Sequence, residues 1–213
     1  MYLPAHFEEK DPRTLHALMR AHPLATIVTL DRSGAIVANH IPLLLRADGG
    51  GLGALHGHVA RANPLWSDLA QGFEALAIFQ GAGGYISPSW YASKKEHGKV
   101  VPTWNYCTVH AYGPLQVHDD AAWVRPQVEA LTAGQEAAMP RPWAVTDAPE
   151  AFVESMLRNI VGIEIPIARL SGKWKMSQNQ PSANRAGVVE GLAARGGEEA
   201  GEVARLVRER STR

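Results

Sequence analysis

Short runs of apolar and β-branched residues alternate along the chain with clusters of turn-forming residues, a pattern typical of antiparallel strands. In the first sixty residues, extended runs are predicted at 25–30, 35–45 and 52–59. Turn residues at 31–34 and 48–51 separate them, and no helical pattern lies between them. A doubly wound parallel sheet needs helices that alternate regularly with its strands, so the pattern argues against that architecture.

Further strands are predicted at 75–79, 103–118 and 160–170. Apolar residues at helical spacing predict helices at 12–22, 64–72, 121–136 and 149–160, and from residue 185 onward. The last turns of the chain, 198–210, are expected to form a solvated amphipathic helix. Six or more strands with peripheral helices predict a single α+β domain, a small closed or half-open β-barrel decorated with helices.

Composition and charge narrow the function classes. The chain has 213 residues, of which 46% are hydrophobic and 20% charged, so intrinsic disorder is excluded. Lysine plus arginine (21) balance aspartate plus glutamate (21), and no recognition helix is evident, which disfavours a directly DNA-binding repressor. No apolar run approaches the ~20 residues of a membrane span, and no signal-peptide pattern opens the chain. We therefore expect a soluble, cytoplasmic protein.

Cysteine and histidine offer little for metal chemistry. The single cysteine, Cys107, excludes an internal disulfide and a cysteine-based zinc site, and its place within a predicted strand favours a packed thiol. His56 and His58 share one face of a predicted strand, and His40 or His110 could join them. Because no carboxylate or cysteine lies nearby in sequence to complete a ligand set, we do not expect a metal site.

The first candidate for binding is the segment 55–66, in which Arg61 falls between a strand end and a helix start at Asn63-Pro64. Free backbone N–H groups at a helix start favour an anion, and a guanidinium can hold a phosphate through two parallel hydrogen bonds. Such an arrangement is common, so this segment alone favours a solvated arginine over a phosphate site.

Two further segments have the composition of a ligand site. Residues 81–113 contain six of the fifteen aromatic residues, interleaved with serine, lysine and asparagine: Tyr85, Trp90, Tyr91, Trp104, Tyr106 and Tyr112. This mixture suits a planar heteroaromatic ligand or a protein interface, and one small barrel cannot hide so many large rings, so a second copy of the chain is expected to cover them. The polar segment 171–188 suits the edge of a flavin or pterin ring, or an ordinary surface loop.

Taken together, six motifs resemble the PaiB-type, FMN-binding negative transcriptional regulators. They are MYLPAHF (1–7), HPLATIVT (22–29), HIPLLL (40–45), GHVARANPLW (57–66), YISPSWYASKKEHGKVVPTWNY (85–106) and GKWKMSQNQ (172–180). The resemblance covers residues 1 to about 192. It implies a split β-barrel of the flavin-reductase and pyridoxamine-phosphate-oxidase type, working as a homodimer with FMN at the subunit interface. Residues 1–192 would form the FMN-binding domain with helical additions, and 193–213 a helical tail.

The resemblance also assigns roles. It favours Arg61 as the phosphate ligand, places the strand HIPLLL against the isoalloxazine ring, and adds the polar motif at 172–180. Together with the candidate segments described above, it leads us to expect cofactor contacts from His40, Ile41, Pro42, His58, Val59, Arg61, Asn63, Trp90, Tyr91, Trp104, Asn105, Lys175, Ser177 and Gln178. Ala92 departs from the family, which more often has proline there, so this loop should be more mobile.

Two functions remain open, and no catalytic acid or base stands out. One is an FMN-binding, homodimeric negative regulator of transcription. The other is a flavin-dependent oxidoreductase that uses a nicotinamide or another reductant. A flavin carries its own chemistry, so both functions make the same demand on the pocket.

Overall fold

The computed structural model describes residues 1–47, 51–69 and 74–211. The predicted turn at 48–51 and the predicted helix at 64–72 therefore lie partly outside the described residues. The chain divides into two compact units, which we call unit 1 and unit 2. Unit 1 comprises Met1–Leu18, Gln80–Val109 and Ser171–Arg213, and unit 2 comprises Met19–Phe79 and His110–Leu170.

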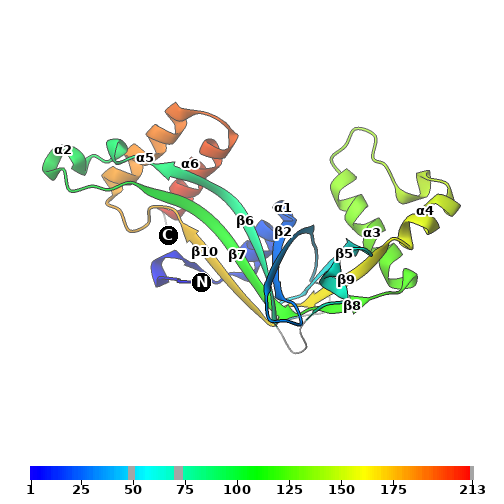
Figure 1. Ribbon diagram of the computed structural model, residues 1–213. Coiled ribbons are helices and arrows are strands. Elements are labelled where there is room, and N and C mark those ends of the chain that lie inside the picture. The colour runs from blue at the N-terminus through cyan, green and yellow to red at the C-terminus, as the bar shows by residue number, and fades with distance from the viewer. Residues whose placement is uncertain (48–50, 70–73, 212–213) are drawn as a thin grey trace. The chain divides into compact units, whose positions relative to one another are not determined.

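The elements are antiparallel strands with helices at the chain's surface and ends, so the α+β prediction is confirmed. The strands are β1 (Glu8–Glu9), β2 (Leu24–Leu30), β3 (Ile36–Pro42), β4 (Leu44–Arg46), β5 (Ala54–Ala60), β6 (Glu74–Ile86), β7 (Thr103–Pro114), β8 (Gln116–His118), β9 (Ile160–Pro166) and β10 (Arg169–Lys175). The α-helices are α1 (Pro12–Ala21), α2 (Ser93–His97), α3 (Ala121–Glu136), α4 (Glu150–Leu157), α5 (Ser182–Arg195) and α6 (Glu198–Arg210). Single 3₁₀ turns are η1 (Ala5–Phe7), η2 (Pro64–Trp66), η3 (Pro88–Trp90) and η4 (Val145–Asp147). One sheet has the order β1-β10-β7-β6-β2-β3 and the other β4-β5-β9-β8 (Figure 1).

In unit 2, β2 and β3 form the predicted hairpin, in register from Leu24 opposite Pro42 to Leu30 opposite Ile36. Its turn is closed by Asp31, whose Oδ1 accepts hydrogen bonds from Ser33 N at 2.8 Å and Ala35 N at 2.9 Å. The predicted run 35–45 breaks after Pro42, and β4 pairs instead with β5 in the four-stranded sheet. The alternating pattern of β5 and β9 buries one face of that sheet, with Leu55, Val161, Ile163 and Ile165 inaccessible to solvent.

Two predicted strands are in fact pairs of strands. The run 103–118 divides into β7 and β8, and the run 160–170 divides into β9 and β10; the members of each pair belong to different sheets. β7 ends at Pro114 and β9 ends at Pro166. Proline has no N–H to donate to a ladder, so each marks a point where the chain leaves one sheet.

The predicted strand 75–79 is too short, because β6 continues through three glycines to Ile86. At Gly81 the small residue is required by packing. A Cβ there would lie 2.6 Å from the Cys107 Sγ and 3.0 Å from Leu18 Cδ1. Glycine inside a strand often marks such a close approach.

The predicted helix at 64–72 is wrong in its described part, which contains only the single turn η2. The residues after η2 pair with the β2–β3 turn and do not continue as a helix. Leu69 forms an antiparallel β-bridge with Asp31, and Arg32 N donates to Asp68 O at 3.1 Å.

The C-terminal region forms two helices instead of one, α5 and α6, which pack against one another (Figure 1). Gly196 (φ 73°) and Gly197 (φ 88°) make the turn between them, a conformation that side chains disfavour. Helix α6 is amphipathic as predicted, but it is not simply solvated, because Val203, Ala204 and Val207 on one face are buried within unit 1. The separation of 193–213 from 1–192 stays a prediction.

Candidate functional site

The structure divides the predicted site residues between the two units, and we describe each group by itself. Unit 2 carries His40, Ile41, Pro42, His58, Val59, Arg61 and Asn63; unit 1 carries Trp90, Tyr91, Trp104, Asn105, Lys175, Ser177 and Gln178.

Arg61 is the first residue after β5, and backbone hydrogen bonds on both of its sides fix its position. Arg61 N donates to Asn159 O at 2.8 Å, and Arg61 O accepts from Trp66 Nε1 at 2.8 Å. The guanidinium Nε donates to Arg158 O at 2.7 Å, and Nη2 also reaches Ile160 O at 3.3 Å. The side chain is held by main-chain carbonyls and is nevertheless 40% exposed.

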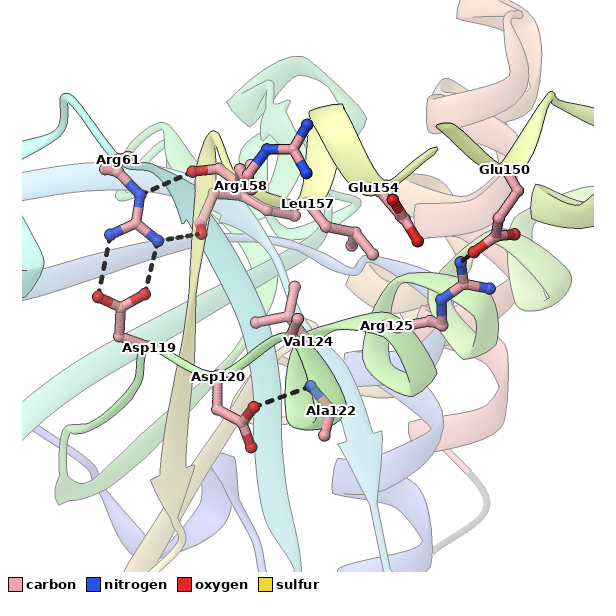
Figure 2. Close-up of a pocket in the computed structure, with 12 residues that line it drawn as sticks. Arg61, Asp119, Asp120, Ala122, Val124, Arg125, Glu150, Glu154, Leu157 and Arg158 are labelled. Carbon is pink, nitrogen blue, oxygen red and sulfur yellow. Dashed lines mark hydrogen bonds and ion pairs between the residues drawn. The ribbon is translucent and has the colours of Figure 1, made fainter. Parts of the chain in front are cut away.

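The fork of Arg61 faces Asp119, in the loop before α3 (Figure 2). Nη1 donates to Asp119 Oδ2 at 2.9 Å and Nη2 to Oδ1 at 2.5 Å, a bidentate ion pair. The hydrogen bonds from Arg61 lower the pKa of Asp119 and the pairing raises that of Arg61. No motif in the sequence points to this partner, which lies 58 residues away, although a phosphate would use the same geometry.

A cavity of about 500 Å³ lies beside this pair, between the start of α3 and the end of α4 (Figure 2). Its charged lining residues are Arg61, Asp119, Asp120, Arg125, Glu150, Glu154 and Arg158, and its apolar ones include Val124, Leu157 and Ile160. Arg125 pairs with Glu150, which also lines the cavity, and Asp120 Oδ1 caps α3 by accepting from Ala122 N at 3.0 Å. The cavity is therefore lined by side chains of both charges and by apolar side chains.

Asn63 caps η2 as predicted, its Oδ1 accepting from Leu65 N at 2.9 Å. We expect a helix start here whose dipole favours an anion, but η2 is a single turn of three residues and supplies no such dipole. An anion at this place would therefore be held by the Arg61 side chain. The Asn63 Nδ2 donates to Asn39 Oδ1 at 2.8 Å and so joins the loop after β5 to β3.

Three buried side-chain nitrogens have no hydrogen-bond partner among the described residues: Asn39 Nδ2, Gln127 Nε2 and Arg185 Nε. Each belongs to a side chain bonded to a predicted site segment. Asn39 bonds Asn63, Gln127 Oε1 lies 2.8 Å from His58 Nδ1, and Arg185 Nη1 donates to Gln180 O at 2.7 Å. Buried polar atoms are normally paired, and all three atoms are donors, so each of them suits an acceptor oxygen or nitrogen. Asn39 and Gln127 belong to unit 2 and Arg185 to unit 1.

The remaining residues of the unit 2 group differ in accessibility. His40 and Pro42 are exposed on one face of the edge strand β3, with His40 Nδ1 3.0 Å from Thr26 Oγ1. Ile41 and Val59 are buried in the core, at 6% and 4% exposure, so neither side chain faces solvent.

His56, one of the histidines considered as a metal ligand, contacts a carboxylate together with His118. His56 Nε2 and His118 Nε2 share the carboxylate of Glu164, at 3.5 and 2.8 Å, and the His118 ring stacks on Trp123. Desolvation lowers the pKa of His56, outweighing the nearby Glu164, which raises it. Within the part of the chain that is described, no group of three or more histidine, cysteine or acidic side chains is arranged to hold a metal ion.

In unit 1, the polar motif 172–180 turns back on β7. Asn105 and Ser177 form a buried pair, in which Asn105 Nδ2 donates to Ser177 Oγ at 2.9 Å. Ser177 has a φ of 62°, the left-handed region that non-glycine residues avoid and that often marks functional sites. Lys175 Nζ donates to Thr103 Oγ1 and, at 2.7 Å, to Trp104 O; burial lowers its pKa. The side chain of Gln178 closes the turn through the backbone of Met176 and Trp174.

The aromatic residues of the segment 81–113 differ in how far they are exposed to solvent. Trp90 packs on α5, and Tyr91 is 4% exposed, with burial raising its pKa. Trp104 is 59% exposed and Tyr85 41%, and their rings meet edge to face with centroids 6.3 Å apart. Of the rings proposed to cover a ligand, only Trp104 is largely accessible in unit 1.

The sequence and the fold of this chain are similar to those of known proteins. The model of a family described as "Putative FMN-binding domain" matches residues 1–169. The chain is 35% identical over 244 residues to the uncharacterized protein AN0679 of Emericella nidulans, covering 99% of this chain and 97% of that protein. It is 28% identical over 210 residues to the protease synthase and sporulation protein PAI 2 of Bacillus subtilis, covering 99% and 98%. Among solved structures, the FAD and heme binding protein of Mycobacterium smegmatis superimposes with a TM-score of 0.54 at 20% identity, covering 79% of this chain and 73% of that one. In the described residues we find no helix that is both long and apolar enough to span a membrane.

Proposed function

Because the chain belongs to the family described as "Putative FMN-binding domain", we propose that it is an FMN-binding protein of the PaiB type that acts as a negative regulator of transcription. The motif resemblance is confirmed at the level of the family, and the fold is that of the flavin-binding split barrels. The choice of FMN, the regulatory role, the homodimer and the cytoplasmic location are our proposals.

The observation that carries the flavin-binding part of the proposal is a pair of buried donors in unit 2, Asn39 Nδ2 and Gln127 Nε2, which have no partner among the described residues. Their side chains are hydrogen-bonded to Asn63 and His58, two residues of the predicted site. A bound flavin offers acceptors of the matching kind in its ring carbonyls, ring nitrogens, ribityl hydroxyls and phosphate. Leaving a donor buried and unpaired costs about 1–3 kcal/mol, so a ligand that satisfies these donors gains affinity from them.

The residues of the chain would then have separate tasks. Arg61 would hold the phosphate, since its fork is oriented by the carbonyls of Arg158 and Ile160. Asn39 and Gln127 would donate to ligand oxygens from beside Asn63 and His58. When bound, FMN supplies one- or two-electron redox chemistry, and the protein contributes binding, orientation and electrostatics.

The alternative function, a flavin-dependent oxidoreductase, uses the same pocket, so one measurement separates the two. Purified protein loaded with FMN is mixed with NADH or NADPH, with and without an electron acceptor. Rapid oxidation of the nicotinamide that depends on bound FMN would support the oxidoreductase and contradict a purely regulatory use of the flavin.

FMN binding itself is tested by calorimetric titration of the wild type and Arg61→Ala with FMN and with riboflavin. We expect Arg61→Ala to weaken FMN binding by roughly tenfold to a hundredfold, the scale of a charge-assisted hydrogen bond, and to leave riboflavin unchanged. The matched control is Arg32→Ala, an exposed arginine of unit 2 whose ion pair with Asp68 spans 3.9 Å. Equal losses for both ligands would show that Arg61 does not hold the phosphate.

A further inference from the structure

Arg61 and Asp119 are already joined in the way that a phosphate would join Arg61. Both terminal nitrogens of the guanidinium donate to the carboxylate, at 2.9 and 2.5 Å. A carboxylate and a phosphate present oxygens to an arginine fork with similar geometry. The two acceptors therefore compete for the same donors, and a phosphate reaching Arg61 has to displace Asp119.

The guanidinium does not depend on Asp119 for its orientation. Its Nε donates to Arg158 O at 2.7 Å and its Nη2 to Ile160 O at 3.3 Å, and both acceptors are main-chain atoms (Figure 2). When Asp119 leaves, these bonds still hold the plane of the fork in place. Loss of the carboxylate thus leaves a preorganised anion site and does not release a mobile arginine.

Asp119 can move without undoing the structure around it. It follows the end of β8 at His118, and the capping of α3 falls to its neighbour Asp120, which bonds Ala122 N. The Asp119 side chain is 49% exposed and borders the cavity of about 500 Å³, so space for another rotamer is at hand.

We propose that Asp119 is an internal competitor that occupies the phosphate position on Arg61 and so sets the affinity of the site for phosphate-bearing ligands. This inference rests on the proposed function, since it takes Arg61 as the phosphate ligand. Asp119 and Arg61 would have opposite effects on the affinity for FMN, because Asp119 opposes binding of the phosphate while Arg61 promotes it. The competition acts on FMN and not on riboflavin, which has no phosphate.

The test is calorimetric titration of FMN and riboflavin into the wild type, Asp119→Ala and Asp119→Asn. We expect Asp119→Ala to tighten FMN binding by roughly threefold to tenfold, the scale of an exposed bidentate ion pair, and to leave riboflavin unchanged. Asp119→Asn keeps the shape and one acceptor oxygen without the charge, so its effect should have the same sign and a smaller size. In the Arg61→Ala background, Asp119→Ala should no longer change FMN affinity.

Glu154→Gln is the matched control, because Glu154 is a carboxylate that lines the same cavity from α4. If removal of any nearby negative charge tightens FMN binding equally, Glu154→Gln will match Asp119→Asn, and the proposal is overturned. It is also overturned if Asp119→Ala weakens FMN binding or leaves it unchanged, since the pair would then support the loop without competing.

These outcomes are distinct from failure of the proposed function. A wild-type protein that binds neither flavin contradicts FMN binding altogether. A wild type that binds FMN, with an Arg61→Ala variant that loses nothing, contradicts both the phosphate role of Arg61 and the competition. A normal response of Arg61→Ala rejects the competitor role alone when it is combined with no gain in Asp119→Ala, or with a Glu154→Gln variant that matches Asp119→Asn.

Discussion

The indole of Trp90 lies so close to Gly191 of α5 that a Cβ on this glycine would be 2.3 Å from the ring. One turn earlier, a Cβ on Gly187 would lie 1.9 Å from Trp90 O. The two glycines thus let η3 and α5 approach, and Trp90 serves the packing of unit 1 in addition to any part in ligand binding.

Gly191→Ala should destabilise the protein, because the new methyl group meets a rigid ring. Overpacking of this kind costs about 1–3 kcal/mol, which exceeds the gain of up to about 1 kcal/mol in helix propensity. Gly201→Ala in α6 is the control, since a Cβ there meets nothing within 4 Å and should stabilise the helix. Urea denaturation of both variants measures the difference, and equal stabilisation by the two would contradict the packing argument.

Arg210 anchors the last turn of α6 by pairing with the carboxylate of Glu9, with 14% and 6% of the two side chains exposed. Desolvation raises the pKa of Glu9, but hydrogen bonds from Asp11 N and Arg210 outweigh it, so the net shift is downward. A lowered pKa gives stability that is present above the ordinary value of 4.5 and is lost as the pH falls below it.

Arg210→Met should therefore cost about 3 kcal/mol, the lower end for removing one partner of a buried ion pair. It should also flatten the loss of stability on acidification, because the pKa of Glu9 moves back toward its ordinary value. Thermal unfolding between pH 7 and the acid range, with exposed Arg208→Met as the control, measures both effects. A steeper acid dependence in Arg210→Met than in the wild type would argue against the pair.

Burial raises the pKa of the Cys107 thiol from 9.0 to about 11. Since the folded state holds this proton more firmly, the contribution to stability is complete below pH 9 and is lost as the pH rises through about 11. The wild type should lose up to roughly 3 kcal/mol more than Cys107→Ala over this range, on the scale of two pKa units. Parallel denaturation curves for the two proteins at pH 8 and 10.5 would show that the thiol does not titrate in this way.

Tyr85 and Trp104 are exposed and their rings meet edge to face, and we expect a second copy of the chain to cover them in the proposed homodimer. If FMN lies at that boundary, dimerisation and FMN binding tighten each other by the same factor. Sedimentation of a dilution series with and without FMN should show a dimer that persists to lower concentration when FMN is present.

A monomer with undiminished flavin affinity would contradict this coupling. Trp104→Ser should weaken both the dimer and FMN binding. Trp143→Ser removes an indole of similar exposure, 47%, from unit 2 and should affect neither.

The sequence by itself determined the features that depend on neighbouring residues. The hairpin of β2 and β3 follows from alternating apolar residues around the Asp31 turn, and the cap at Asn63 follows from a side chain that bonds the backbone two residues on. The family follows from motifs of contiguous residues.

Only the tertiary structure decided the contacts between distant segments. A period of two residues predicts a strand but not the sheet to which it belongs, so the divisions at Pro114 and Pro166 were missed. Likewise, the sequence predicted an anion site at Arg61, but the carboxylate of Asp119 that occupies its fork lies 58 residues away. The unpaired donor of Asn39 is equally hidden, because whether a buried group finds a partner depends on every chain segment packed around it.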